Sequence, residues 1–416
     1  MISTAVIAEF NPFHNGHQYI IETARTRTNA DIIIVVMSGN YVQRGGPALL
    51  DKFTRTKYAI EHGADIVIEL PIFSSMGKAD CFATGAIAIL EAFYKVDYLC
   101  FGCETDHLHI LEQIADVQLN PESLYQQQLR EYLSEGYAFA RASQMAMETC
   151  VLSGQTEKFD LSMLEQPNTL LAIEYLKAIR LCHSSIQPFV IERRDSGYHS
   201  NNIIQCDGIT FQSASAIRNE MAANQLHKIV GVPNDIKEEL IRFVKKNSVL
   251  YDEDFFSLIR YKLLTLSKDS PVRNMDTISV NSKVLNRIVN AFGKYNNLND
   301  FLSYMTSKNI TKAYTRRMLF HILFETYESI DVTKVDYIRI LGISASGAKL
   351  LKQRKESSYV TPLLRKLADD IPQIKEEAGL SKIQKCIQAD EIYYLLLSDK
   401  TKQPMISEFE RTLIHP

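Results

Sequence analysis

The sequence predicts an α/β fold in which a Rossmann-like parallel sheet is followed by a mainly α-helical C-terminal region. Short apolar runs alternate with helical segments through the first hundred residues. The run DIIIVVMS, at 31–38, is continuously apolar and rich in Ile and Val, which is typical of a strand buried on both faces of a parallel sheet. From about residue 230 the pattern turns helical, with few strands.

The elements of the first part follow a regular order. Strands are expected at 4–10, 31–38, 65–70, 96–104 and 186–194. The helices between the first four strands are expected in GHQYIIETARTRT, DKFTRTKYAIEHG and CFATGAIAILEAFYK. These helices are long enough for right-handed crossovers, so we expect the strands to pair in parallel. Further helices are expected in 105–185, the clearest at 168–180, and one that opens with serines within 210–221.

Composition is that of an ordinary globular protein of two or three domains. Of the 416 residues, 46% are hydrophobic and 23% are charged, which allows sizeable cores. No segment approaches about 18 uninterrupted apolar residues, and the N-terminus lacks a basic region and a small-residue cleavage site. We therefore expect a cytoplasmic protein that does not associate with membranes, divided into domains at 1–230 and 231–416.

The cysteines argue against a disulfide framework and against a metal site. There are seven, an odd number, and they are spread along the whole chain. Cys100 and Cys103 form one CFGC pair, but a structural zinc site needs a second pair of similar spacing, and the sequence has none. We expect these two residues to close a strand, and we expect no metal ion held by the protein itself.

Charge is distributed unequally between the two parts. Residues 1–229 contain 17 Lys and Arg against 26 Asp and Glu, a net charge of −9, whereas residues 230–416 contain 29 against 23, a net charge of +6. An acidic first part and a basic second part indicate different binding partners for the two.

The stretch EFNPFHNGH, at 9–17, contains the residues whose types and spacing point most directly to a chemical function. It places His14 and His17 at the first turn of a helix that follows a strand. A helix N-terminus binds anions through its unpaired N–H groups and the helix dipole, and Gly16 allows close backbone approach. Histidine can donate to a phosphate as charge develops there. The motif therefore suits a triphosphate whose α-phosphorus is attacked, although it is neither a Walker A loop nor a G-x-G-x-x-G motif.

A strand followed by HNGH at the start of the first helix resembles the HIGH-type nucleotidyltransferase superfamily. Seven stretches together resemble a narrower group, the bacterial tRNA(Met) cytidine acetate ligases: AEFNPFHNGH, SGNYVQRGGPALLDKFTR, GADIVIELP, FGCE, PNTLLAIEYLKA, RRDSGYHS and SASAIR. The resemblance covers residues 1–220 and continues more loosely in YTRRMLFHILF and DYIRILGIS. It implies a sheet of the HUP/nucleotidyltransferase type.

The resemblance also implies a two-step reaction. Acetate attacks the α-phosphorus of ATP, which gives acetyl-adenylate and pyrophosphate. The N4 amine of the wobble cytidine in elongator tRNA(Met) then attacks the acetyl carbonyl, which gives N4-acetylcytidine and AMP. Mg²⁺ is expected as the counter-ion of ATP, bound largely by phosphates and water.

The resemblance assigns roles to residues of the first domain. His14 and His17 are expected to be catalytic, with His17 stabilising charge in the transition state. ATP is expected to contact Ile7, Ala8, Glu9, Phe10, Asn11, Pro12, Phe13, His14, Asn15, Gly16, His17, Gln18, Tyr19, Ile20, Gly102, Asn168, Arg193 and Arg194.

Several of these assignments have alternatives that the residue types alone leave open. Asn168 either contacts the nucleotide or caps its helix, and the same choice applies to Ser213 and Ser215, which resemble a phosphate-binding motif. Arg44 could orient acetate or contact RNA. Lys52 and Arg55, which follow it, could be only the exposed face of an amphipathic helix.

Basic residues of the second domain are candidates for tRNA binding. Lys308, Lys312 and Arg316 recur at four-residue intervals with Arg317 adjacent, so on a helix they would share one face. Aromatic residues among the basic clusters could stack on unpaired loop bases. The wobble base would have to leave its loop to reach the adenylate.

Two other functions fit part of the sequence. An adenylyltransferase acting on a small phosphorylated metabolite would explain HNGH and the sheet, but it gives no reason for the basic helical region. A non-catalytic RNA-binding protein would explain that region, but it would not need an intact His14, Gly16 and His17. The oligomeric state stays open.

Overall fold

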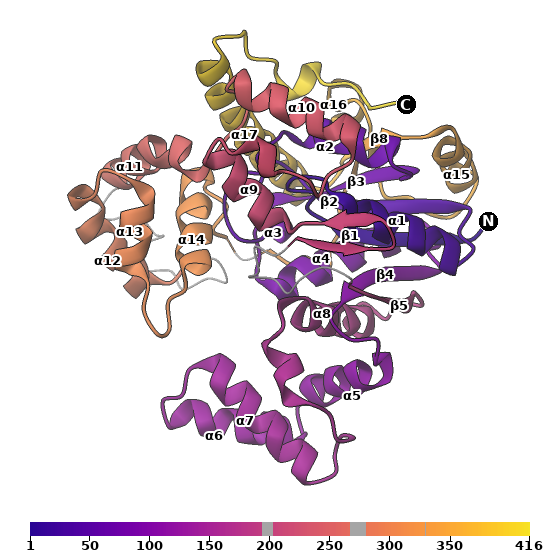
Figure 1. The fold of residues 1–416 in the computed structure, drawn as a ribbon, viewed down its shortest axis with the longest axis vertical. Coiled ribbons are helices and arrows are strands. Elements are labelled where there is room, and N and C mark those ends of the chain that lie inside the picture. The colour runs from indigo at the N-terminus through magenta and orange to yellow at the C-terminus, as the bar shows by residue number, and fades with distance from the viewer. Residues whose placement is uncertain (194–202, 267–279, 329) are drawn as a thin grey trace.

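The computed structural model describes residues 1–193, 203–266, 280–328 and 330–416, and its centre is one seven-stranded sheet (Figure 1). The strand order is β5-β4-β1-β2-β3-β8-β9. Five strands are parallel, as expected: β1 (Ser3–Ala8), β2 (Ile32–Ser38), β3 (Ile66–Leu70), β4 (Tyr98–Cys103) and β5 (Gln187–Glu192).

The crossover helices cover both faces of the sheet, and one of the crossovers returns the chain from β3 to β4, next to β1. They are α1 (Asn15–Arg27), α2 (Lys52–Glu61), α4 (Ala79–Phe93) and α8 (Pro167–Leu181), with a single-turn α3 (Ile72–Ser75) before α4. The chain runs from β1 through β2 to β3 and then returns to place β4 on the other side of β1. The strand order therefore reverses between β1 and β4, which is where such sheets bind ligands.

Strand β2 is buried on both faces, which confirms the reading of its apolar run. Ile34 and Val36 belong to a core that includes residues of α4 and α8. Ile33 and Val35 belong to the core on the opposite face, with residues of α1 and α2. Because side chains alternate along a strand, a continuous run of Ile and Val supplies both layers at once.

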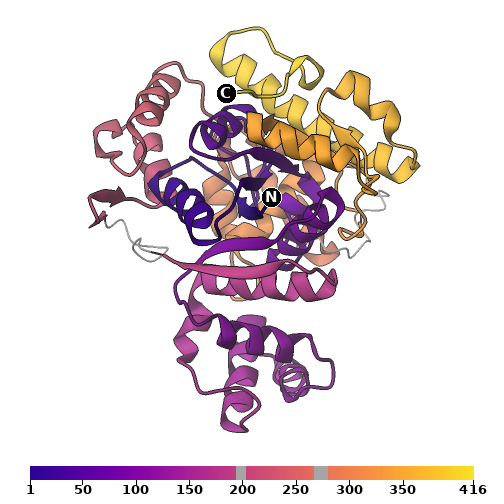
Figure 2. The ribbon, with the colours of Figure 1, turned by 90° about the vertical axis from the view of Figure 1, so that its right-hand side faces the viewer.

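Three further helices extend away from the sheet as a lobe below it in both views (Figures 1 and 2). They are α5 (Leu108–Leu119), α6 (Leu124–Ser134) and α7 (Phe139–Leu152). Helix α5 packs against α8, which anchors the lobe to the sheet.

The rest of the chain is mainly helical. After a short hairpin of β6 (Ile204–Cys206) and β7 (Ile209–Phe211) come α9 (Ala214–Ala222), α10 (Asn234–Lys245), α11 (Phe256–Thr265), α12 (Ser282–Ala291), α13 (Leu298–Met305), α14 (Lys312–Phe324), α15 (Ala345–Lys355), α16 (Leu367–Asp370) and α17 (Glu377–Thr401). Residues of α11 to α14 and α17 share a core of their own with Tyr41 and Phe73. Among the described residues, no helix is long and apolar enough to span a bilayer.

Two strands of this second half join the first-half sheet, which the sequence did not predict. Strand β8 (Ile338–Ile343) pairs antiparallel with β3, and β9 (Leu363–Leu364) pairs with β8. Without β8, the fully buried β3 would have an open edge. The division at residue 230 stays a prediction, and the sheet is continuous across it.

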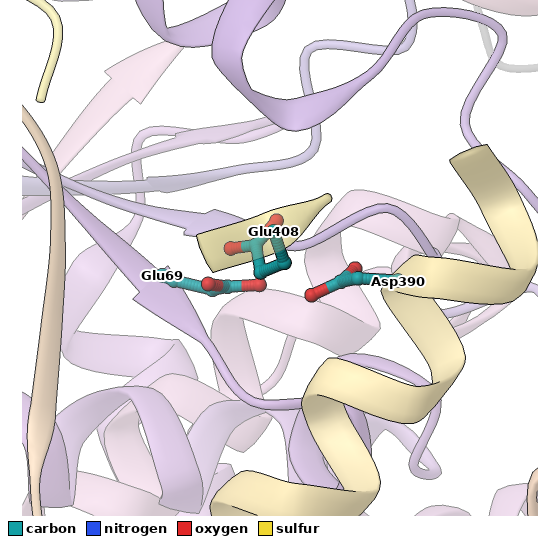
Figure 3. Close-up of side chains that lie close together, drawn as sticks. All are labelled: Glu69, Asp390 and Glu408. Atoms are coloured by element: carbon teal, nitrogen blue, oxygen red, sulfur yellow. The ribbon is translucent and has the colours of Figure 1, made fainter. Parts of the chain in front are cut away.

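Lys52 and Arg55 are almost fully buried, so the expectation that they form an exposed helix face is wrong. The ammonium of Lys52 lies 2.8 Å from Glu69, 2.6 Å from Asp390 and 2.9 Å from Glu408. Figure 3 shows these three carboxylates turned toward one another. Burial acts to lower the pKa of Lys52, but the carboxylates outweigh it and raise the pKa. The cluster ties α2 and β3 to α17 and the C-terminal segment.

Candidate nucleotide-binding site

A cavity of about 440 Å³ lies at the carboxyl ends of β1, β4 and β5, beside the reversal of strand order. It brings together most of the residues predicted to contact ATP: Ile7, Ala8, Glu9, Phe10, Asn11, His14, Gly16, His17, Tyr19, Ile20, Gly102, Asn168 and Arg193. Ser213 and Ser215, predicted to contact phosphate, also line it, as does Arg44.

The histidine pair is stacked at the start of α1. Helix α1 begins at Asn15, directly after His14, and the rings of His14 and His17 lie 3.6 Å apart at 20°. A Cβ on Gly16 would lie 2.9 Å from Cε1 of His14, so a larger residue here would displace that ring. The sequence had suggested glycine for ligand approach, and the structure adds this second reason.

The environment of His17 sets its protonation. The backbone N–H of His14 donates to Nδ1 of His17 at 3.2 Å, so the neutral ring carries its proton on Nε2. Burial lowers the pKa of His17 well below its ordinary value, and the neighbouring His14 and Arg193 lower it further. His17 is therefore a neutral side chain with one N–H to donate.

The turn between β1 and α1 is strained and tightly held. Phe10 has a φ of 49°, a region that a bulky residue rarely adopts, and its buried ring packs 4.8 Å from that of His17. Asn11 is held on both sides: its side-chain oxygen accepts from the N–H of Leu49 at 2.9 Å, and its carbonyl accepts from Arg218 at 2.8 Å.

Glu104, which the sequence analysis did not single out, organises the end of β4. Its carboxylate accepts from the backbone N–H groups of Asn168 (3.3 Å) and Thr169 (2.7 Å), so it caps α8 from outside the helix. It also accepts from Nδ2 of Asn168 at 2.6 Å. Oδ1 of Asn168 in turn accepts from Arg193 at 3.1 Å. The side chain of Asn168 therefore does not cap its own helix; its amide is oriented between Glu104 and Arg193.

The start of α9 contributes hydroxyl groups and a cation. Ser213 caps the helix by accepting from the N–H of Ala216 at 3.1 Å, so capping and a place in the cavity coexist. Ser215 Oγ accepts from Arg218 at 3.0 Å. Because Arg218 also holds Asn11, it connects α9 to the turn that carries the histidines.

The loop after β2 forms a further wall. The N–H of Gln43 donates to Glu9 at 2.9 Å, and Arg44 lines the cavity beside them. Burial lowers the pKa of Arg44, an effect that the charge of Glu9 opposes. Together with Arg193 and Arg218, Arg44 makes the cavity a cationic site suited to an anionic ligand.

Four residues of the predicted stretch do not line the cavity: Pro12, Phe13, Asn15 and Gln18. Phe13 is fully buried against other rings, and Asn15 donates to the carbonyl of Thr210 at 2.7 Å. Arg194 lies outside the described residues.

The four basic residues predicted to bind tRNA fall into two pairs, one exposed and one bonded to other parts of the chain. Helix α14 begins at Lys312, so the expectation that Lys308 shares its helical face is wrong. Lys308 and Lys312 are exposed. Arg316 is paired with Asp252 at 2.9 Å, and Arg317 donates to the carbonyl of Gln43 at 3.2 Å.

Comparison with known proteins shows the family of the chain. Residues 1–408 match the family model described as HIGH Nucleotidyl Transferase. The chain is 35% identical over 395 residues to the tRNA(Met) cytidine acetate ligase of Thermoanaerobacter sp. (strain X514), with 94% of each chain covered. It is 32% identical over 413 residues to that of Halothermothrix orenii, with 96% of each covered.

The fold is also similar to a solved structure, that of Thermotoga maritima TmcAL bound with alpha-thio ATP. The TM-score is 0.86, the sequence identity is 26%, and both chains are covered completely. The chain therefore belongs to the HIGH nucleotidyltransferase family and, within it, to the tRNA(Met) cytidine acetate ligases.

Proposed function

We propose that this protein is an ATP-dependent ligase that activates acetate and acetylates N4 of the wobble cytidine of elongator tRNA(Met). The observation that carries the proposal is the pair His14 and His17, set at a helix N-terminus within a cationic cavity at the reversal of the strand order. The family to which the chain belongs has this activity in its name.

In the first step, a carboxylate oxygen of acetate attacks the α-phosphorus of ATP, and the bond to pyrophosphate breaks. Negative charge increases on the oxygens of the α-phosphate as it becomes five-coordinate. Nε2–H of His17 is the donor that would meet this charge, and it needs no proton transfer because the ring is already neutral. His14 stacks on the ring and limits its rotation.

The rest of the cavity suits the remaining parts of ATP. Adenosine would lie near Gly102, Asn168 and Arg193, which line the cavity at the carboxyl ends of β4 and β5 and the start of α8. The β- and γ-phosphates would meet Ser213, Ser215 and Arg218 at the start of α9.

Mg²⁺ fits the site as a partner of the phosphates. Two cavity residues are carboxylates, Glu9 and Glu192, and Glu9 already accepts from the N–H of Gln43. The ion would therefore be held mainly by phosphate oxygens and water, and it would neutralise the charge of the departing pyrophosphate.

In the second step, the cytidine N4 attacks the acetyl carbonyl, the bond to AMP breaks, and N4 loses a proton. Binding of the tRNA by the basic second half is part of the proposal. Lys308 and Lys312 support it because both are exposed, Lys312 as the first residue of α14 and Lys308 shortly before it, where they could contact phosphates. A tRNA substrate implies action in the cytoplasm.

The test is mass spectrometry of nucleosides from elongator tRNA(Met) that has been incubated with the protein, ATP, Mg²⁺ and isotopically labelled acetate. Labelled N4-acetylcytidine is expected with the wild type and its loss with His17→Ala. His227→Ala is the matched control, because His227 is exposed and does not line the cavity, and this variant should retain activity. Pyrophosphate exchange that depends on a phosphorylated metabolite, with no acetylation, would instead support an adenylyltransferase.

A further inference from the structure

The loop at 41–47, which carries Arg44 into the cavity, is attached to the second half of the chain. It is a compact turn: Val42 donates to the carbonyl of Gly46 at 3.0 Å, and Gly45 donates to that of Val42 at 2.8 Å. Tyr41 at its start donates through its hydroxyl to Ala389 of α17 at 2.8 Å. We call residues 41–47 the Arg44 loop.

Helix α14 and the segment before α11 pack directly on the tip of this loop. Gly45 has a φ of 75°, and a Cβ there would lie 2.4 Å from the backbone nitrogen of Arg317. A Cβ on Gly46 would lie 2.4 Å from Oδ1 of Asp252, whose carboxylate is paired with Arg316. The loop therefore lies against the backbone of α14 at a distance that only glycine allows.

Gln43 connects this contact to the reaction centre. Its carbonyl accepts from Nη1 of Arg317 at 3.2 Å, and its N–H donates to Oε1 of Glu9 at 2.9 Å. Glu9 directly follows β1 and is the first residue of the connection that leads to the histidines. A single residue of the loop is thus bonded on one side to the second half and on the other to the cavity wall.

We propose that Arg317 is a positioning residue for acetate activation: it fixes Gln43 and so places Arg44 and Glu9 at the reacting end of the cavity. The second half is then needed for the first chemical step, before any tRNA binds. This inference rests on the proposed function. It differs from the sequence-based prediction that Arg317 contacts tRNA, because that role would affect only the second step.

The two roles are separated by acetate-dependent ATP–pyrophosphate exchange without tRNA. Arg317→Gln is expected to lower kcat/KM for acetate by about tenfold or more, mainly through KM, because a displaced Arg44 would bind the acetate carboxylate less well. The Kd for ATP should change little. Arg317→Lys should recover part of the activity by donating to the same carbonyl. Arg130→Gln, at an exposed position on α6, is the matched control.

Gly45→Ala tests the same contact between the Arg44 loop and α14 without changing Arg317. The added methyl group should displace the loop from α14 and raise the KM for acetate in the same direction. Unchanged exchange by folded Arg317→Gln, or a change in melting temperature alone, would overturn the inference. A rise only in the KM for tRNA would also overturn it. Absence of acetate-dependent exchange in the wild type would instead contradict the proposed function itself.

Discussion

The protonation of His17 follows from contacts made within a few residues of it. The N–H of His14 occupies Nδ1, and the rings of Phe10 and His14 cover the side chain. Burial deprives a charged imidazole of its hydration here, and His14 and Arg193 beside it disfavour the charged form further. His17 is therefore a neutral donor, as its proposed contact with the α-phosphate requires.

We expect His17 to keep its proton on Nε2, and to remain neutral, at pH values below the ordinary histidine pKa of 6.5. Because its pKa is lowered in the folded protein, protonation requires a more acidic solution. Long-range ¹H–¹⁵N spectra of histidine-labelled protein between pH 5.5 and 7.5 measure this directly. The His17 signals are assigned by their absence in His17→Gln. A ring that becomes charged near pH 6.5 would contradict the prediction.

At the scale of the element, two helices are positioned by hydrogen bonds to residues that lie outside them. Helix α8 takes its N-terminal cap from Glu104, which lies at the end of β4. Helix α14 is bonded through His321 to the carbonyl of Met76 near α4. Each contact places a helix relative to the sheet, and so relative to the cavity.

Glu104→Gln should weaken α8 and the nucleotide site together. The amide keeps one acceptor but loses the charge that favours a helix N-terminus, so we expect a loss of about 1 kcal/mol in the free energy of unfolding. Asn168 and Arg193 also lose their fixed orientation, which should raise the Kd for ATP. Urea unfolding and calorimetric titration with ATP measure the two effects. Glu148→Gln, at an exposed site in α7, should change neither.

His321 should make stability depend on pH in the acid range. Burial lowers its pKa to about 4, so between pH 6.5 and about 4 the unfolded chain binds a proton that the folded chain does not. Stability is therefore lost as the pH falls through this window. Between pH 7 and pH 5 we expect the wild type to lose about 2 kcal/mol more than His321→Gln. Equal losses in urea unfolding would refute the assignment.

At the scale of the whole molecule, the second half completes the first. Strand β8 covers the edge of β3, and α17 supplies Asp390 to the buried Lys52. The Arg44 loop lies between the halves, with one side on the cavity and the other on α14. The cavity is thus lined by the first half of the chain and supported by both halves.

Lys52→Met should destabilise the whole fold. It leaves Glu69, Asp390 and Glu408 close together without the ammonium among them, although Arg339 stays 3.5 Å from Glu408. Removal of one partner from a buried ionic cluster typically costs about 3–5 kcal/mol. Chemical denaturation at pH 7 should show a loss of this size. Lys349→Met, at an exposed position on α15, should stay within about 0.5 kcal/mol of the wild type.

The sequence alone determined the features that depend on neighbours along the chain. The five parallel strands and their crossover helices followed from apolar periodicity, and the histidine turn followed from the order of a strand, a glycine and a helix start. Most cavity residues of the stretch 7–20 were predicted because one short segment places them all.

Only the tertiary structure decided which distant residues meet. The local sequence predicts an exposed Lys52, and its burial depends on Asp390 and Glu408, which come from the C-terminal part of the chain. The local sequence also gives Glu104 no role beyond the end of a strand, and its capping role depends on the position of α8. Arg317 lies in a basic stretch, yet its guanidinium contacts Gln43, 274 positions away. The local pattern predicts on which face of a helix a charged side chain lies. Whether that side chain is buried depends on the partners that folding brings to it from elsewhere in the chain.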